Sequence, residues 1–178
     1  MIRVLHPATP PSDDTMGSWG RAAAQPAISE ALFALHEHAA NVAALHRPVC
    51  LSSGRCCHFA DHGHVLLVTG LEAAWVYQRL AVPTPTEETS RPSAKGVCAH
   101  LKGGQCAIHS IRPLGCRAYF CDAGQGPWQA TLAESLHSAV RRLHDEYSVE
   151  YLCAEWTWLA AVLEGANERG LLKAGPLP

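Results

Sequence analysis

The chain has 178 residues, of which 48% are apolar and 17% are charged. The apolar residues are sufficient for the core of one folded domain, and the charged fraction is lower than in highly charged disordered proteins. Its 14 basic and 16 acidic residues give a formal net charge of −2 at pH 7, so the chain as a whole has no field that attracts nucleic acid. No stretch approaches the roughly 20 apolar residues of a membrane span. We therefore expect neither nucleic acid nor a membrane as a partner.

Residues 1–25 are rich in Pro, Ala, Ser and Gly without sustained periodicity, which predicts a poorly ordered lead-in. Prolines and acidic residues interrupt what a secretory signal needs, namely a basic start followed by an apolar core. We therefore expect a cytoplasmic protein with reduced cysteines. Residues 26–170 are expected to form a single domain.

Helical patterns account for most of the chain outside its cysteine-rich segments. The first begins at Pro26, a favourable first-turn residue, and ends at Pro48. The second begins at Thr69 and Glu72, which form a capping box directly after a short run of valines and leucines expected to be a strand. A third pattern follows Pro127, and another near the C-terminus is either a separate helix or its continuation. We predict a mainly α fold, with a small α+β fold as the alternative, in which a helical scaffold carries two irregular cysteine-rich loops and at most a short strand or hairpin.

The 8 cysteines and 11 histidines are the unusual part of the composition, because both side chains bind metals at neutral pH. In a reducing compartment, closely spaced cysteines favour metal binding or redox chemistry over a disulfide framework. The metal-binding part of the domain is expected over residues 50–121, where a bound metal would offset the ordering entropy of two glycine-containing segments. The candidate metal ligands in these segments are Cys50, Cys56, Cys57, Cys98, Cys106, Cys116 and Cys121.

The adjacent residues Cys56 and Cys57 leave two alternatives, because neighbouring side chains point to different sides of an extended backbone. Either one of them binds a metal while the other packs, or the pair bridges two metals or one cluster. Cys153 lies among apolar residues of a helical pattern and is expected to be a core thiol. For the candidate ligands, the competing interpretations are buried apolar thiols and a disulfide-stapled extracellular module, whose sulfurs would be paired at about 2.05 Å.

Thiolates around a divalent ion leave a negative charge, which nearby cations or hydrogen-bond donors must balance. The basic residues placed to do so are Arg55, Lys102, Arg112 and Arg117. His100 and His109 lie within the cysteine spacing and either bind the metal or orient a loop through a ring N–H.

The second cysteine segment has the pattern Cys98-x-His100-Leu101-x3-Gln105-Cys106-x-Ile108-His109-x2-Arg112-Pro113-x2-Cys116-Arg117-x-Tyr119-x-Cys121. This pattern resembles the YkgJ-type cysteine-cluster family, whose members are described as zinc- or iron-chelating proteins. The strand and helix start that ends at Glu72 is also similar to that family, and the resemblance covers residues 50–121. It implies a metal-ion binding protein that chelates zinc, iron or an iron–sulfur cluster through its clustered cysteines.

One position departs from the family pattern. The family opens with a segment similar to Cys-x2-Cys-Gly-x-Cys-Cys, whereas this chain has Ser53 at the second cysteine position. Serine is a poor ligand for zinc or iron at neutral pH, so the site is expected to bind less tightly or to use water or a nearby histidine instead. The nearby histidines are His58, His62 and His64.

The alternative function is an iron–sulfur enzyme. A flagellin lysine N-methylase also looks related through the cysteine pattern, which implies redox or methyl-transfer chemistry as the second possibility. A pocket beside the metal with an open coordination position or a perturbed acid or base would favour it. No catalytic residue can be assigned, because the sequence has no nucleotide-binding glycine motif, serine nucleophile elbow or metalloprotease His-Glu-x2-His pattern.

Overall fold

The computed structural model describes residues 9–50, 53–80, 96–121 and 126–172. The predicted mainly α fold with only short strands is confirmed. In chain order the elements are α1 (Asp13–Ala24), α2 (Pro26–His46), the 3-10 turn η1 (Arg55–Cys57), α3 (Phe59–His62), β1 (Leu67–Thr69), α4 (Gly70–Gln78), β2 (Leu101–Lys102), β3 (Gln105–Cys106), α5 (Leu114–Ala118), α6 (Trp128–Glu146), β4 (Cys153–Glu155) and α7 (Trp156–Glu168).

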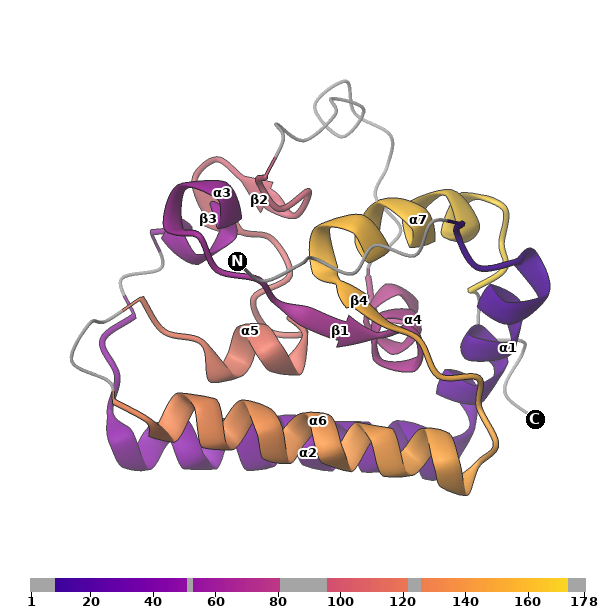
Figure 1. Cartoon of the computed structure of the whole chain (residues 1–178), viewed down its shortest axis with the longest axis horizontal. Coiled ribbons are helices and arrows are strands. Elements are labelled where there is room, and N and C mark those ends of the chain that lie inside the picture. Colours follow the sequence, from indigo (N-terminus) through magenta and orange to yellow (C-terminus); the bar gives the residue numbers. More distant parts are fainter. Residues whose placement is uncertain (1–8, 51–52, 81–95, 122–125, 173–178) are drawn as a thin grey trace.

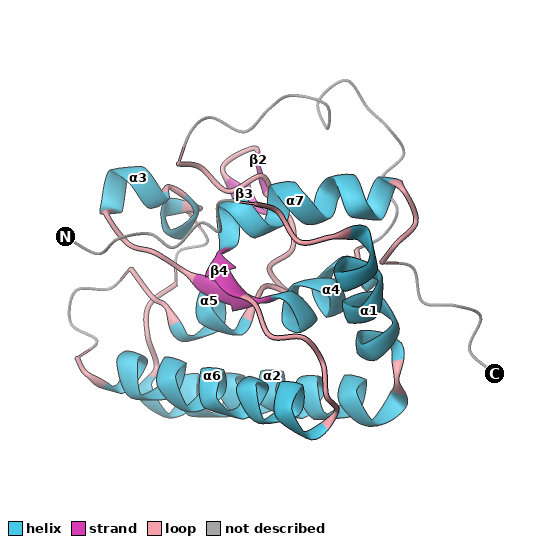
Figure 2. Ribbon diagram, turned by 45° about the vertical axis from the view of Figure 1, so that its right-hand side comes forward, coloured by secondary structure: helices cyan, strands magenta, loops and turns pink. Residues whose placement is uncertain are grey.

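The long helices α2 and α6 lie side by side and form one layer of the molecule (Figure 1). The short helix α5 packs on this layer, and the strand pair of β1 and β4 lies between α5 and α7 (Figure 2). Helices α1 and α4 pack together at one end of the molecule, whereas α3 and the hairpin of β2 and β3 lie at the other. The cysteine segments belong to this second end.

Helices α2 and α6 form where their sequence periodicity predicts them. Helix α2 has Pro26 in its first turn and ends at Arg47, whose φ of 48° is left-handed. Its apolar stripe buries Ile28, Leu32 and Ala39. The apolar stripe of α6 buries Leu132, Leu136, Val140 and Leu143.

The capping box at the start of α4 is confirmed. The backbone N–H of Glu72 donates to Oγ1 of Thr69 at 3.3 Å, and the backbone N–H of Thr69 donates to the Glu72 carboxylate. Because residues 70–77 are buried all round, α4 is the central helix of the core.

The strand β4 corrects one prediction. It pairs antiparallel with β1, so that Leu67 faces Glu155 and Thr69 faces Cys153. Placing Cys153 in a helical pattern is therefore wrong, because α7 begins only at Trp156 as a separate helix. Pairing with a distant strand overrides the local apolar spacing.

Helix α1 corrects the prediction of a poorly ordered lead-in over residues 1–25. Trp19 is fully buried, and its indole lies against Gly70, where an added Cβ would be 2.4 Å from the ring. The Nε1–H of Trp19 donates to the carbonyl of Glu150 at 2.8 Å. The prediction is wrong for residues 13–24, where Ser12 caps the helix by accepting a hydrogen bond from the N–H of Thr15, and Asp13 and Asp14 lie in its first turn.

Two further predictions fall wholly or partly on undescribed residues. The start of the lead-in, residues 1–8, and most of the polar loop predicted from Pro83 to Gly96 lie outside the described residues. Among the helices in the described ranges, none combines the length and apolar character that a membrane span needs.

Candidate metal centre

The two cysteine segments are joined by backbone hydrogen bonds. The N–H of Cys98 donates to the carbonyl of Cys57 at 2.8 Å, and the N–H of Ala60 donates to the carbonyl of Gly96 at 3.1 Å. Before this junction, Gly54 adopts a φ of 69°, which lets the chain enter the turn η1. The turn is closed by the N–H of Cys57, which donates to the carbonyl of Gly54 at 2.8 Å.

The second segment contains the hairpin of β2 and β3. Its two turn residues, Gly103 and Gly104, have φ angles of 53° and 78°, as a tight two-residue hairpin turn requires. The hairpin places Cys106 opposite Leu101. Gly54 of the first segment lies so close to it that an added Cβ would be 2.5 Å from the carbonyl oxygen of Gly104. Glycine turns thus bring the two segments together.

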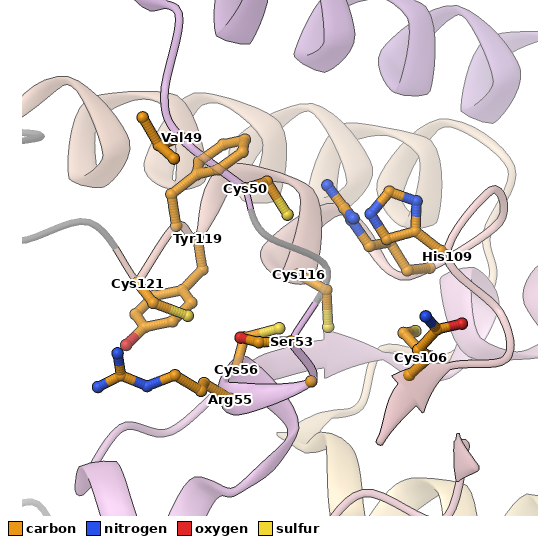
Figure 3. A pocket seen from close by; sticks show the side chains of 14 residues that line it. Val49, Cys50, Ser53, Arg55, Cys56, Cys106, His109, Cys116, Tyr119 and Cys121 are labelled. Atoms are coloured by element: carbon orange, nitrogen blue, oxygen red, sulfur yellow. The ribbon is translucent and has the colours of Figure 1, made fainter. Parts of the chain in front are cut away.

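A cavity of 660 Å³ opens between these segments and α5. Figure 3 shows the cysteine side chains in its wall directed toward its interior. These residues are Cys50, Cys56, Cys106, Cys116 and Cys121. The other lining residues used below are Ser53, Arg55, His109, Arg112, Tyr119 and Phe120. Within the described part of the chain, the wall contains no carboxylate.

A second cavity of 30 Å³ lies on the core side of the first. Cys56, Cys106 and Cys116 line both cavities, and Cys57 and Cys98 line the second. Together the two cavities gather every cysteine that the sequence identifies as a candidate ligand. Cys153, expected to be a core thiol, lines neither of them and is half-buried in β4.

The thiol of Cys57 lies at the centre of this group. Contacts with Cys106, Cys56 and Cys98, in that order, raise the pKa of Cys57 far above its usual range, so this thiol keeps its proton, which it can donate to one of these sulfurs at a time. The contact with Cys57 is the largest cause of a lowered pKa in Cys56, Cys98 and Cys106. The thiol of Cys121 in turn hydrogen-bonds with Cys56. The lowered pKa values of Cys56, Cys98 and Cys106 favour the thiolate, which is the form of cysteine that binds metals, whereas burial raises the pKa of Cys116 and Cys121.

Arg112 lies in the wall of both cavities. After the hydrogen bonds from Cys57, its charge is a further cause of the lowered pKa of Cys56 and Cys106. Within the described ranges, the buried Nε of Arg112 has no hydrogen-bond partner. An anionic metal–thiolate group would supply the missing acceptor. Of the other predicted cations, Arg55 lines the larger cavity, whereas the exposed Lys102 lines neither.

The histidines that follow the cysteine pair line neither cavity. The Nε2–H of His64 donates to the carbonyl of Cys56 at 3.0 Å, and its ring stacks on Tyr119 with centroids 4.4 Å apart. His64 therefore positions the backbone of Cys56. The Nδ1 of His58 lies 3.4 Å from the carboxylate of Asp61, away from the cysteines.

The remaining donors near the cysteines are placed differently from one another. Ser53, at the position where the family pattern has a cysteine, lines the larger cavity. His109 is the histidine found in the described walls of both cavities. His100 lies between the rings of Tyr77 and Trp156, at centroid distances of 5.9 and 5.6 Å, lines neither cavity, and has a buried Nε2 without a hydrogen-bond partner in the described structure.

His36 is a residue whose role the sequence does not reveal, because it occupies an ordinary helical position in α2. It is buried, and its Nδ1 accepts a hydrogen bond from Nε of Arg117 at 2.7 Å. Burial, followed by the charge of Arg117, lowers the pKa of His36 to about 3, so the imidazole is neutral. Arg117 also donates to the carbonyl of Ser110. The hydrogen bond between Arg117 and His36 therefore holds α5, which carries Cys116, against α2.

Glu72 also helps to place α5. Besides its role in the capping box, its Oε1 accepts a hydrogen bond from the backbone N–H of Leu114 at 2.6 Å. Leu114 is the first residue of α5, so a single buried carboxyl group connects α4 to the helix that carries Cys116.

We expect Glu72 to make stability fall as the pH rises from 4.5 toward 7. Burial raises the pKa of its carboxyl from 4.5 to about 7 in the folded protein, whereas the unfolded chain releases the proton near 4.5. Between these values the folded state binds more protons, so the free energy of unfolding decreases with pH, by on the order of 3 kcal/mol in total. Urea unfolding of metal-free protein from pH 5 to 8 measures this change.

Glu72→Gln is the control for this measurement, because glutamine keeps an oxygen acceptor for the N–H of Leu114 but cannot ionise. The stability of the wild type relative to the variant should fall between pH 5 and 8. A difference that is the same at every pH would contradict the assignment.

The donor set fits a thiophilic metal. Among the described residues, no group of three or more Cys, His, Asp or Glu side chains is placed to hold a metal ion, so binding would require the thiols to move. The observations in favour are the linked thiols, the lowered pKa values of several of them and the unpartnered Nε of Arg112. Cysteine sulfur binds zinc and iron, alone or in iron–sulfur clusters.

Comparison with known proteins adds no relative to this description. No protein-family model, no curated protein and no solved structure matches the chain. What it does therefore has to be inferred from the arrangement of its own residues.

Proposed function

We propose that this chain is a metal-ion binding protein that chelates zinc, iron or an iron–sulfur cluster through its clustered cysteines. The observation that supports the proposal is the convergence of two segments, separated by a long insertion, on one pair of cavities lined by thiols. Buried apolar thiols would not need a shared cavity, a buried arginine Nε without an acceptor, or contacts between sulfurs.

The donors of the resident site are expected to be the cysteines that line the core-side cavity, which we call the inner set: Cys56, Cys57, Cys98, Cys106 and Cys116. Within this set Cys57 contacts three other sulfurs and keeps its proton, so this proton is the one that a bound cation would displace. Arg112 would balance the negative charge of the thiolates. The adjacent Cys56 and Cys57 both face sulfurs of the set, which favours a shared role over one binding while the other packs.

A second candidate function, an iron–sulfur enzyme for redox or methyl-transfer chemistry, is favoured by the size of the larger cavity. A structural zinc site is closed by its ligands, whereas a volume of 660 Å³ beside the inner set has the size of a small-molecule pocket. Visible absorption that changes when a reductant or S-adenosylmethionine is added would support this function. A colourless protein containing zinc would count against it.

The proposed function is tested by metal analysis and optical spectra of protein purified anaerobically. The wild type is expected to contain stoichiometric zinc or iron, and the double variant Cys106→Ala, Cys116→Ala should lose it. Iron with sulfide and visible charge-transfer absorption would identify a cluster, and zinc without colour a chelating site.

Cys153→Ala is the matched control, because this thiol lies outside both cavities and its loss should leave the metal content unchanged. Far-UV circular dichroism checks that every variant remains helical. Wild-type protein that contains no metal and takes up none from Zn²⁺ or Fe²⁺ solutions would overturn the proposal.

A further inference from the structure

The cysteines around the larger cavity differ in their exposure to solvent. Cys50 and Cys121 are exposed, Cys56, Cys106 and Cys116 are half-buried, and Cys57 and Cys98 are buried. The thiols therefore form a series from the opening of the cavity to the core. Cys50 and Cys121 line only the larger cavity, whereas the inner set lines the smaller one.

The outer thiols are continuous with the inner ones. Cys121 hydrogen-bonds with Cys56, which in turn hydrogen-bonds with Cys57. Cys50 is close enough for its charge to act on Cys121. Figure 3 shows Cys50 and Cys121 approaching the cavity from different parts of its wall. These contacts connect the exposed thiols with the inner set.

The surroundings of the outer thiols suit capture of an ion that arrives with a carrier. A closed site must open before an ion can enter, whereas the cavity of 660 Å³ leaves room for a small carrier ligand still attached to the ion. Arg55, exposed in the same wall, gives an anionic carrier a cation to approach.

We propose that Cys50 and Cys121 form an outer pair that transfers a thiophilic divalent cation between solvent and the inner set by ligand exchange. This inference rests on the proposed function, because it requires an inner set that binds the cation. In each exchange one thiolate forms a bond to the cation and one carrier ligand leaves. The proton of the incoming thiol goes to the buffer, and neither sulfur nor metal changes its oxidation state. Cys56 then replaces Cys121 on the cation in the same way.

The test measures the rate of metal transfer separately from affinity. Metal-free protein is mixed anaerobically with the Zn²⁺ complex of 4-(2-pyridylazo)resorcinol, and loss of the coloured complex is followed by stopped flow. In the double variant Cys50→Ser, Cys121→Ser we expect uptake to slow about tenfold or more, with the final Zn²⁺ stoichiometry and the equilibrium affinity unchanged. Release of Zn²⁺ to EDTA should slow by a similar factor, because both directions use the same path.

Two further variants interpret the result. Cys153→Ser removes a thiol outside the cavities and should transfer Zn²⁺ at the wild-type rate. Cys98→Ser removes a buried member of the inner set and should lower the final affinity. Equal rates for wild type and the outer double variant would overturn the inference, and so would loss of stoichiometric Zn²⁺ in that variant, which would make the outer pair resident ligands. Failure of the wild type to take up Zn²⁺ or Fe²⁺ would instead refute the proposed function itself.

Discussion

Replacing Gly54 by alanine is expected to destabilise the protein by about 2–4 kcal/mol and to separate the two cysteine segments. A Cβ at this position would be 2.5 Å from the carbonyl oxygen of Gly104 and 2.6 Å from Cδ1 of Leu101. The oxygen belongs to the backbone of a tight hairpin, so it cannot move aside alone. The φ of 69° adds a further cost, because an L-residue with a side chain is strained there.

If the proposed function holds, the same substitution should also weaken metal binding. The turn η1 begins next to Gly54 and carries Cys56 and Cys57, whereas the hairpin carries Cys106. Pushing the hairpin away lengthens the path between sulfurs that hydrogen-bond in the native protein. We therefore expect Gly54→Ala to lose most of its bound metal, as measured by metal analysis after dialysis, together with a lower urea midpoint.

Gly63→Ala is the matched control. Gly63 has a similar φ of 62°, but nothing lies within 4 Å of the Cβ that alanine would add. Its substitution should destabilise the protein only through the strain of an L-residue at positive φ, by about 1 kcal/mol, and should leave the metal content unchanged. If the two variants behaved alike, close contact between the cysteine segments would not be the reason that Gly54 is needed.

The parts of the fold that follow from sequence are those with local signals. Helix α2 lies between its two prolines, and α4 begins at the capping box formed by Thr69 and Glu72. Both signals depend on residues within one turn of the helix end, so they need no knowledge of the fold. The clustering of the cysteines is likewise visible in the sequence, because all the candidate ligands lie in two short segments, 50–57 and 98–121.

The parts that the sequence does not reveal depend on distant partners. The strand β4 exists because its backbone pairs with β1, which precedes it by about half the chain, and a three-residue strand has too few side chains to show alternation. In the sequence His36 has the spacing of a surface residue of a helix. In the structure Arg117 of α5 covers it and donates a hydrogen bond to its Nδ1. Glu72 reads as a helix cap, but its hydrogen bond to the N–H of Leu114 follows only from the packing of α5 on α4.

The candidate site shows the same division. The identity of its thiols comes from spacing, whereas their order from exposed to buried comes only from the fold. Arg112 is an intermediate case. Its position near Cys116 in the sequence suggests a cation close to the thiols, but only the fold shows that its Nε is buried without a partner in the described structure. The histidines after the cysteine pair resemble ligands in the sequence, yet His64 donates to a backbone carbonyl.

Trp19→Ala should destabilise the protein by about 3–5 kcal/mol, because it removes a large aromatic side chain from a filled site. Trp19 is fully buried against Gly70, and the cavity left behind cannot collapse easily because α4 is packed on every side. The variant also leaves the carbonyl of Glu150 without the indole N–H that it accepts at 2.8 Å. Equilibrium urea unfolding followed by far-UV circular dichroism measures the change.

Two comparison variants separate the contributions of Trp19. Trp19→Phe keeps most of the apolar contact and loses the hydrogen bond, so it should cost about 1–2 kcal/mol. Phe33→Ala removes a comparable ring from α2 that is 57% exposed, and it should cost less than about 1 kcal/mol. If Trp19→Ala cost no more than Phe33→Ala, α1 would not be part of the core, and the lead-in predicted from the sequence would be correct after all. A cost of the expected size would make α1 the element that holds α4, and through Glu72 the helix carrying Cys116, in place.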